Sequence, residues 1–325
     1  MYKIAVPEMI IDEKDLPDEI LAKCELIIGA KNEVGDNRQF IDHINELDAI
    51  VFTSINDMSK GVMEKAENLK IAFKAGAWPH NIDFNYAENN GIAVGWSPAA
   101  NARSVAEYTL LLILAANKKF SHAIKTLELG GWRNESHLGE DIKGKRIGIV
   151  GLGAIGKEVS VFLKALSVDV IGYDPFLDEE GFDNIGVKKV SFDKLIQTSD
   201  VITIHSPLTK DTNKMFNKEV FTKMKNDSII INTARGGLID EEELIKSLKT
   251  QEIKGAALDV FAEEPLPLSS ELRKLNNVIL TPHIAARTTQ SSIKEILWAI
   301  QGAFNYLEGK KIDNAKIVYP NKNKQ

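Results

Sequence analysis

A glycine-rich turn set between two apolar runs is the part of the sequence with the most recognisable chemistry. The run 146–150 leads directly into the turn 151–156, which reads Gly-Leu-Gly-Ala-Ile-Gly. After a strand, glycines at this spacing allow a tight turn, a close approach of the backbone to a pyrophosphate and close packing of the next helix. The N-terminus of that helix adds free N–H groups and a positive dipole end. The pattern predicts a dinucleotide site with contacts from Gly151, Gly153, Ala154, Ile155 and Gly156.

An acidic residue follows the turn at the distance that a ribose-binding carboxylate requires. Asp174 ends the next apolar run, 168–173, and lies 21 residues beyond Gly153. A carboxylate there can accept hydrogen bonds from the hydroxyls of the adenosine ribose, and its charge repels a 2′-phosphate. The following residues, 175–178, contain no Arg or Lys. The sequence therefore predicts NAD rather than NADP as the cofactor.

Three polar residues in the second half each follow a predicted strand, at the edge where doubly wound sheets bind their ligands. They are Arg235, Glu264 and His283. The planar guanidinium of arginine makes two parallel, charge-assisted bonds to a carboxylate. A histidine beside a carboxylate can hold a proton near neutral pH and release it. Together the three predict an anion clamp and a proton donor. Singly, each has a structural alternative, as a turn residue, a surface ion pair or a core histidine.

Short apolar runs alternate with helical patterns along most of the chain, which is typical of parallel α/β architecture. Residues 101–107 open a long helix, and a closing helix over 291–307 is expected to return to the first domain. The sequence predicts strands at 3–6, 25–28, 49–53, 70–74 and 93–96 in one sheet, and at 146–150, 168–173, 187–190, 201–204, 228–232, 255–259 and 278–280 in a second.

Composition limits the classes of protein to consider. With 325 residues, of which 44% are hydrophobic, the chain is expected to form two domains. The net charge of −6 argues against nucleic acid as a partner. Cys24 is the only cysteine, which excludes an internal disulfide and a Cys-based metal cluster and favours a cytoplasmic location. The longest apolar stretch, 110–116, is too short to span a bilayer.

Several further motifs occur together in this chain: 101–107, the glycine turn, Ser206-Pro207-Leu208-Thr209, 232–240, 257–265 and 281–284. Through these motifs the chain resembles the D-isomer-specific 2-hydroxyacid dehydrogenase family nearly end to end. The resemblance implies an α/β fold of two Rossmann-like domains. It further implies that a doubly wound, parallel-sheet NAD-binding domain at 100–287 is inserted into a smaller flavodoxin-like substrate-binding domain at 1–99 and 288–325. A homodimer, clasped by the helix after Asn101, is also implied.

The same resemblance implies roles for individual residues. Arg235 would bind the substrate carboxylate, His283 would be the acid/base, and Glu264 would orient His283. Asp259 matches the family position near the nicotinamide, and no metal is implied. Further cofactor contacts are expected at His205, Pro207, Thr212, Thr233, Ala234 and His283.

The chain departs from the family pattern where the substrate is expected to bind. Family members commonly carry a Gly-x-Gly turn whose amides hold the substrate carboxylate, whereas this chain reads Gly76-Ala77-Trp78. Trp78 replaces the second glycine, so either the loop keeps its amides by another turn type or the pocket changes shape. Thr53 stands where phosphoglycerate dehydrogenases tend to carry an arginine, and Lys74 or Arg287 are the alternative cations.

These features favour some substrates over others. The segment after His283 lacks the aromatic pair of D-lactate dehydrogenases, and formate dehydrogenases carry a glutamine where this chain has Glu264. Phosphite remains an alternative substrate. The expected reaction is hydride transfer between NADH and a small 2-oxo acid, of the hydroxypyruvate, glyoxylate or phosphoglycerate type. The alternative is an NAD-sensing, corepressor-like binding protein of the same fold, which the acidic charge disfavours.

Overall fold

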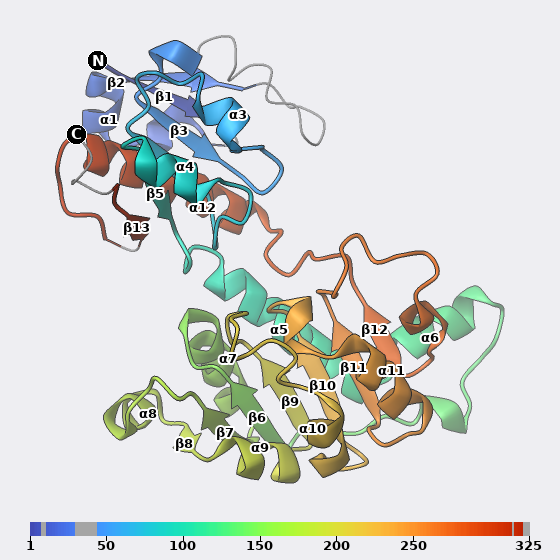
Figure 1. Cartoon of the computed structure of the whole chain (residues 1–325). Coiled ribbons are helices and arrows are strands. Elements are labelled where there is room, and N and C mark those ends of the chain that lie inside the picture. Colours follow the sequence, from blue (N-terminus) through green and yellow to red (C-terminus); the bar gives the residue numbers. More distant parts are fainter. Residues whose placement is uncertain (8–10, 30–43, 314, 321–325) are drawn as a thin grey trace. The chain divides into compact units, whose positions relative to one another are not determined.

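The computed structural model describes residues 1–7, 11–29, 44–313 and 315–320. The chain divides into two compact units. The first unit combines Met1–Asn101 with Arg287–Gln325, and the second is Ala102–Ala286. The second unit is therefore inserted into the first. Each unit has its own sheet and helices (Figure 1).

The first unit is built on a six-stranded sheet. Its strand order is β13-β5-β4-β3-β1-β2. Strands β1 to β5 pair in parallel in the flavodoxin-like order 2-1-3-4-5, and β13 is antiparallel to β5. The expected strands of this sheet are confirmed, whereas β13 was not expected. The strands are β1 (Tyr2–Val6), β2 (Cys24–Ile28), β3 (Ala49–Phe52), β4 (Ile71–Lys74), β5 (Ala93–Trp96) and β13 (Lys316–Val318).

The closing helix α12 (Thr289–Leu307) completes the core of the first unit, as the sequence predicts. Thr288 caps it by accepting a hydrogen bond from the backbone N–H of Ser291. Its apolar face packs against β1, β3 and β4 and buries Ile296, Ile300 and Phe304. The other helices of the unit are α1 (Asp18–Lys23), α3 (Lys60–Met63) and α4 (Phe84–Asn89), with short 3-10 turns η1 (Glu13–Asp15) and η2 (Ile44–Glu46).

The second unit is built on a seven-stranded parallel sheet of order β12-β11-β10-β9-β6-β7-β8. When the strands of this unit are numbered from 1 at β6 to 7 at β12, the order from β8 to β12 is 3-2-1-4-5-6-7. This is the 3-2-1-4-5-6 order of dinucleotide-binding folds with one further strand. The predicted fold class is thereby confirmed for both sheets. The strands are β6 (Arg146–Val150), β7 (Asp169–Tyr173), β8 (Lys188–Lys189), β9 (Val201–Ile204), β10 (Ile229–Asn232), β11 (Gly255–Leu258) and β12 (Val278–Leu280).

Helices cover both faces of this sheet because the strands are apolar on both sides. Alternate residues of one strand enter different clusters: Ile230 packs with α9, α10 and α11, whereas Ile229 and Ile231 pack with α5 and α7. Such burial on both faces explains the continuous apolar runs in the sequence. The helices are α5 (Ala102–Asn117), α6 (Phe120–Glu128), α7 (Ala154–Ala165), α8 (Glu179–Ile185), α9 (Phe192–Thr198), α10 (Lys218–Lys223) and α11 (Glu241–Lys249), with 3-10 turns η3 (Glu135–His137), η4 (Gly236–Leu238) and η5 (Glu271–Lys274).

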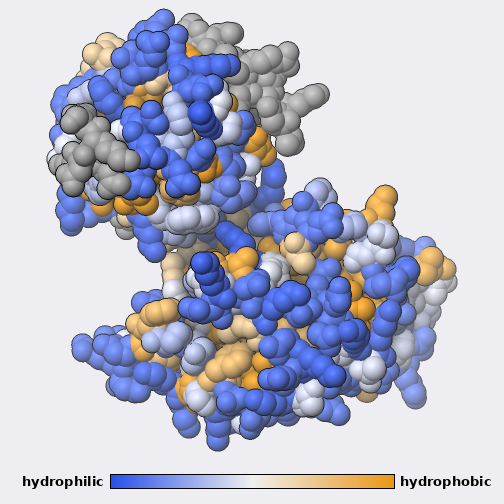
Figure 2. Space-filling model, viewed as in Figure 1, coloured by the Kyte–Doolittle hydropathy of each residue, from blue (hydrophilic) through white to orange (hydrophobic). Residues whose placement is uncertain are grey.

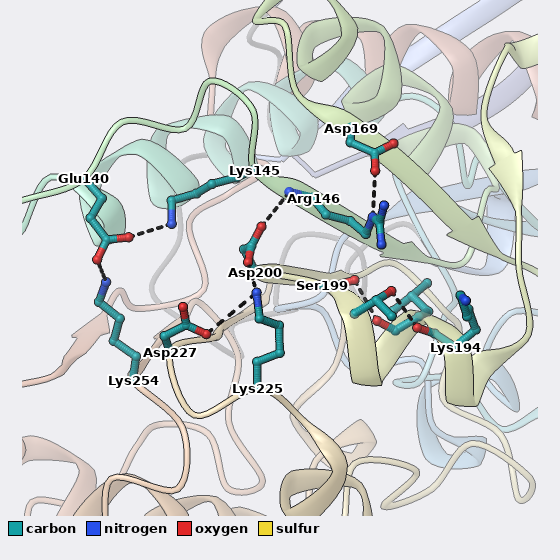
Figure 3. Close-up of polar contacts among 12 residues, drawn as sticks. Glu140, Lys145, Arg146, Asp169, Lys194, Ser199, Asp200, Lys225, Asp227 and Lys254 are labelled. Atoms are coloured by element: carbon teal, nitrogen blue, oxygen red, sulfur yellow. Dashed lines mark hydrogen bonds and ion pairs between the residues drawn. The ribbon is translucent and has the colours of Figure 1, made fainter.

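Charged side chains form a network beside the amino ends of the central strands (Figure 3). Glu140 pairs with Lys145 at 2.6 Å and with Lys254, and these two ammonium groups lower the pKa of Glu140 to about 2. Asp200 accepts a hydrogen bond from the backbone N–H of Arg146 at 2.7 Å and pairs with Lys225. The network ties the loops at this edge together.

The surface is predominantly hydrophilic in the view of Figure 2, with hydrophobic side chains in separate patches. One set of exposed apolar side chains belongs to α6 and the segment after it, which includes η3. These residues, here called the α6 patch, are Phe120, Ile124, Leu127, Leu129, Trp132 and Leu138.

Over the described ranges, no helix combines the length and apolarity needed to cross a membrane.

Candidate active site

The glycine turn between β6 and α7 has the geometry that a pyrophosphate needs. Gly151 has φ +92°, and a Cβ there would lie 2.7 Å from the backbone nitrogen of Ser206. A Cβ on Gly156 would lie 2.1 Å from the carbonyl oxygen of Gly151, so only glycine lets α7 pack this closely. Gly153, the N-cap of α7, has nothing within 4 Å of its Cβ position. The turn is therefore tight on its inner side and open above the helix N-terminus, as the chemistry of a dinucleotide requires.

Asp174 is held in place at the carboxyl end of β7. One carboxylate oxygen accepts a hydrogen bond from the backbone N–H of Leu152 at 2.8 Å, and the other accepts from that of Phe176 at 2.9 Å. These bonds join the acid to the glycine turn. A cavity of about 370 Å³ opens beside it, of a size that accommodates an adenosine group. The cavity is lined by Tyr173, Asp174, Pro175, Glu179, Lys189, Val190 and Ser191.

The three predicted reactive residues lie within the second unit and two of them are in contact. His283 Nδ1 lies 2.6 Å from Glu264 Oε2, and Glu264 Oε1 accepts a hydrogen bond from the backbone N–H of Phe261 at 2.9 Å. Because Glu264 occupies Nδ1, the other ring nitrogen of His283 is left for a reacting group. The imidazole is half exposed. The pair can therefore hold a proton and transfer it to a ligand.

Arg235 lies beside this pair at the carboxyl end of β10. Burial lowers the pKa of its guanidinium, while the negative charge of Glu264 raises it. Its Nη1 donates to the carbonyl of Ala234 at 2.6 Å. A Cβ on Gly236 would lie 1.9 Å from the backbone carbonyl of Phe261, so glycine is needed where the Arg235 turn meets the segment that carries Glu264. A partly desolvated guanidinium binds a carboxylate more strongly than an exposed one does.

Asp259 supports the loop that carries His283. Its side chain is fully buried. It accepts hydrogen bonds from Thr281 Oγ1 at 2.6 Å and from the backbone N–H groups of Ile284 at 3.0 Å and Ala285 at 2.8 Å. His283 itself has φ +53°, a conformation uncommon for a residue with a side chain. The buried carboxylate therefore holds the loop on both sides of a strained residue.

Asn232 is a positioning residue that the sequence did not single out. Its amide nitrogen donates to the carbonyl of Arg235 at 2.9 Å, and its amide oxygen accepts from the backbone N–H of Ala234 at 3.0 Å. The side chain thus closes the turn that presents Arg235. Asparagine as the last residue of an apolar strand, three residues before an arginine, was the available signal, because asparagine commonly closes such turns.

The remaining residues expected to contact the cofactor differ in their burial and in their hydrogen bonds. Burial lowers the pKa of His205 to about 3, so the ring is neutral at physiological pH. Its Nε2 pairs with Thr203 Oγ1 at 2.9 Å, and its buried Nδ1 has no partner among the described residues. The hydroxyl of Thr212 donates to the carbonyl of Pro207 at 2.7 Å. Thr233 and Ala234 are buried, and the hydroxyl of Thr233 lies 3.0 Å from that of Thr109 on α5.

In the first unit, the loop after β4 presents unpaired backbone amides. Gly76 has φ +95°, and its carbonyl accepts a hydrogen bond from the backbone N–H of Ser97 at 2.9 Å. The N–H groups of Gly76, Ala77 and Trp78 have no hydrogen-bond partner within the part of the chain that the structure describes. Successive free amides around a residue of positive φ form a concavity that suits an anion. We call residues 76–78 the amide loop.

Trp78 folds back onto aromatic neighbours of the first unit. Its ring stacks on Phe84 at 5.1 Å between centroids and meets Trp96 edge-on at 4.9 Å, and it remains 52% exposed. The tryptophan in place of the usual glycine therefore leaves the amides free and adds an exposed apolar surface beside them. Of the two expected cations, Lys74 is only 4% exposed and donates to the carbonyl of Ala75 at 3.0 Å, whereas Arg287 is exposed.

Comparison with known proteins adds to this geometry. A family model described as the NAD-binding domain of D-isomer-specific 2-hydroxyacid dehydrogenases matches residues 110–285. The chain is 39% identical over 277 residues to D-3-phosphoglycerate dehydrogenase of Archaeoglobus fulgidus. These aligned residues cover 85% of this chain and 53% of that protein. The chain is also 34% identical over 308 residues to hydroxypyruvate reductase of Thermotoga maritima, and these residues cover 94% of this chain and 98% of that protein.

Solved structures resemble both units together. The structure of D-lactate dehydrogenase with NAD⁺ from Lactobacillus jensenii aligns with a TM-score of 0.78 at 27% identity, covering 96% of this chain and 98% of that one. Apo D-lactate dehydrogenase from Escherichia coli aligns with a TM-score of 0.79 at 26% identity, covering 96% of this chain and 99% of that one. The chain spans about half the length of the phosphoglycerate dehydrogenases that it matches.

Proposed function

Since the chain belongs to the D-isomer-specific 2-hydroxyacid dehydrogenase family, we propose that it is an NAD-dependent enzyme that interconverts a small 2-oxo acid and its D-2-hydroxy acid. The observation that carries this proposal is the contact of His283 with Glu264 at 2.6 Å beside the partly desolvated Arg235. A proton donor beside an anion-binding cation is what reduction of a 2-oxo acid needs. NAD is the cofactor of the family's NAD-binding domain, which this chain contains.

The residues around the glycine turn fit this cofactor. The open space above Gly153 and the free N-terminus of α7 suit its pyrophosphate, and the fixed carboxylate of Asp174 suits the ribose hydroxyls. The buried Nδ1 of His205, which has no partner among the described residues, is a further polar group available to it. When bound, NADH supplies the hydride that is added to C2 of the oxo acid.

His283 would supply the proton in the reduction. Glu264 accepts a hydrogen bond from Nδ1–H and stabilises the positively charged ring, so the second ring nitrogen can carry the proton that the substrate oxygen receives. In the opposite direction the neutral ring would accept the proton of the D-2-hydroxy acid. The bond from the backbone of Phe261 keeps the carboxylate of Glu264 oriented during both steps.

Arg235 and the amide loop would bind the anionic groups of the substrate. The guanidinium offers two parallel donors to a carboxylate and stabilises negative charge that develops on the adjacent oxygen. The three free amides of residues 76–78 offer a second set of anion donors, carried by the first unit. Trp78, which is 52% exposed, would form an apolar wall beside these amides and leave room for a small substrate rather than a long aliphatic one.

The substrate class that these features support is hydroxypyruvate, glyoxylate or the phosphorylated 2-oxo acid related to phosphoglycerate. The named relatives include both a hydroxypyruvate reductase and phosphoglycerate dehydrogenases. Arg287, exposed four residues after His283, is the cation proposed to meet a polar or anionic tail. Its removal is expected to affect a phosphorylated substrate more than glyoxylate.

The active form is proposed to be a homodimer in which a second copy covers the α6 patch. Six large apolar side chains of α6 and the segment after it are exposed. Large exposed apolar patches on soluble proteins mark association sites. The expectation from the sequence places the clasp at the helix after Asn101, which is α5 (Ala102–Asn117), whereas the α6 patch follows that helix in the chain.

The proposed function is tested by following NADH oxidation with a panel of 2-oxo acids: glyoxylate, hydroxypyruvate, its phosphorylated form, pyruvate and 2-oxoisocaproate. Turnover with a small member of the panel is expected, and His283→Ala should lower kcat by about 10²-fold or more while NADH binding persists. The matched control is His122→Ala, which changes a partly exposed histidine of α6 in the same unit. NADH binding without turnover of any oxo acid would instead favour the NAD-sensing binding protein.

A further inference from the structure

A lysine lines the cavity beside Asp174, although the residues directly after Asp174 carry no basic side chain. Lys189 is the second residue of β8 and pairs with Gly172 of β7, two residues before Asp174. Among the described residues that line the cavity, it is the only basic one. The sequence prediction of NAD depends on the acid and on the missing cations at 175–178. The fold therefore brings a cation into the cavity of that acid, and a cation beside the ribose can accommodate a 2′-phosphate.

A second carboxylate of the cavity pairs with this lysine. Glu179, in the first turn of α8, also lines the cavity, and its Oε1 lies 3.1 Å from Nζ of Lys189. The ammonium further lies 5.4 Å from the centroid of the Phe182 ring, on the same helix. Asp174 instead accepts hydrogen bonds from two backbone N–H groups. Both contacts of Lys189 thus direct its ammonium toward α8, and within the described ranges Glu179 is its carboxylate partner.

We propose that Glu179 is a specificity-determining residue for the cofactor: by pairing with Lys189 it keeps the ammonium from a 2′-phosphate, so that the cavity selects NAD over NADP. The inference rests on the proposed function in one respect, namely that this cavity receives the adenosine end of the cofactor. It does not depend on which 2-oxo acid is reduced. Asp174 would select NAD by accepting bonds from the ribose hydroxyls, and Glu179 by occupying the lysine.

The charges of the three side chains explain why this pairing matters. Asp174, Glu179 and Lys189 together carry one net negative charge, which disfavours a 2′-phosphate of about two negative charges. The ribose hydroxyls of NAD are uncharged, so the same field affects NAD binding much less. Replacing Glu179 by glutamine would remove one negative charge and leave the ammonium available to the phosphate. Because the side chain of Glu179 is 79% exposed, the effect should be modest and should be screened by salt.

The experiment measures the Kd of NADH and of NADPH by titrating the fluorescence of the reduced nicotinamide at low ionic strength. In Glu179→Gln, the ratio of the NADPH Kd to the NADH Kd is expected to fall by about threefold or more, mainly through tighter binding of NADPH. This fall should shrink in about 0.5 M salt. The matched control is Glu180→Gln, which removes the same charge at the next, exposed residue of α8 and should leave the ratio near the wild-type value.

The variant Lys189→Met and the double variant separate the effect of the pair from the charge of Glu179 alone. Without the ammonium, Glu179→Gln should give little gain in NADPH binding, so the double variant should resemble Lys189→Met. An equal gain with and without Lys189 would overturn the role of the pair. An unchanged ratio in Glu179→Gln beside normal NADH binding would overturn the inference alone. Absence of NADH binding by the wild type would overturn the proposed function, and this inference with it.

Discussion

At the scale of single residues, the reactive groups depend on neighbours that fix their positions. His283 is oriented by Glu264, which is fixed by the backbone of Phe261. Arg235 is presented by a turn that Asn232 closes. These supporting contacts lie between 2.6 and 3.0 Å, so small changes in them should alter catalysis as strongly as loss of a reacting group.

Arg235→Lys keeps the charge at the end of β10 but removes the fork that makes two parallel bonds. One charge-assisted bond to the substrate carboxylate should be lost, so kcat/KM should fall by about 10- to 100-fold. KM should rise and kcat should fall together. Steady-state kinetics with the preferred oxo acid measure both. Arg273→Lys, an exposed arginine of the same unit, serves as the control, and near-normal kinetics of Arg235→Lys would show that the carboxylate is bound elsewhere.

Asp259→Asn tests the buried support of the His283 loop. The carboxylate accepts three hydrogen bonds, and an amide group must turn its NH₂ toward one of these donors. The free energy of unfolding should decrease by about 1–3 kcal/mol, and kcat should fall because His283 is no longer held at φ +53°. Urea unfolding and steady-state rates measure the two effects. Asp183→Asn, an exposed control, should change neither quantity.

At the scale of elements, the strands of both sheets were predictable because buried parallel strands leave short apolar runs. Strand β8 is shorter than expected, at Lys188–Lys189, and β13 was missed. The pairing of Lys316–Val318 with β5 is antiparallel and joins residues more than two hundred positions apart. Three residues with partly exposed side chains carry no local signal for such a pairing, which only the tertiary structure determines.

The candidate site was predictable to a similar degree. The types and strand-end positions of Arg235, Glu264 and His283 indicated chemistry, and the glycine turn indicated a dinucleotide. The need for glycine at position 236 was not visible, because it arises from contact with the backbone of Phe261. The burial of Lys74 was likewise hidden, since it depends on how α12 packs against the sheet.

The ion pairs at the amino ends of the strands predict a pH-dependent contribution to stability. The pKa of Glu140 is lowered to about 2, so its contribution is complete above its unfolded pKa of about 4.3 and is lost as the pH falls through about 2. Because Glu140 is 47% exposed, Glu140→Gln should lower the free energy of unfolding by at most about 1 kcal/mol at pH 7.

Urea unfolding at pH 7 and pH 3 measures this contribution. The difference between wild type and Glu140→Gln should shrink at the lower pH. Glu180→Gln, which changes an exposed glutamate on α8, should match the wild type at both values. A difference that grows on acidification would contradict the proposed sign of the effect.

At the scale of the whole molecule, the feature that bears on assembly is the α6 patch. Leu127→Lys places a charge among its exposed apolar side chains and should shift a homodimer toward monomer, because burying an unpaired ammonium in an apolar interface is unfavourable. Sedimentation or light scattering across a concentration series measures the change. Leu268→Lys alters a leucine that is 90% exposed in the same unit and should leave the mass unchanged. An unaltered mass of Leu127→Lys would exclude this face from assembly.

The insertion of one unit into the other has a consequence for the order in which the chain acquires structure during synthesis. The second unit is continuous from Ala102 to Ala286, so all of its strands are available once that stretch has left the ribosome. The first unit instead needs Ile296, Ile300 and Phe304 of α12 to fill its core, although its β1 to β5 are synthesised first. Strands β1 to β5 should therefore become resistant to proteolysis only after α12 has been made. The second unit, which lies between them in the sequence, should become resistant earlier.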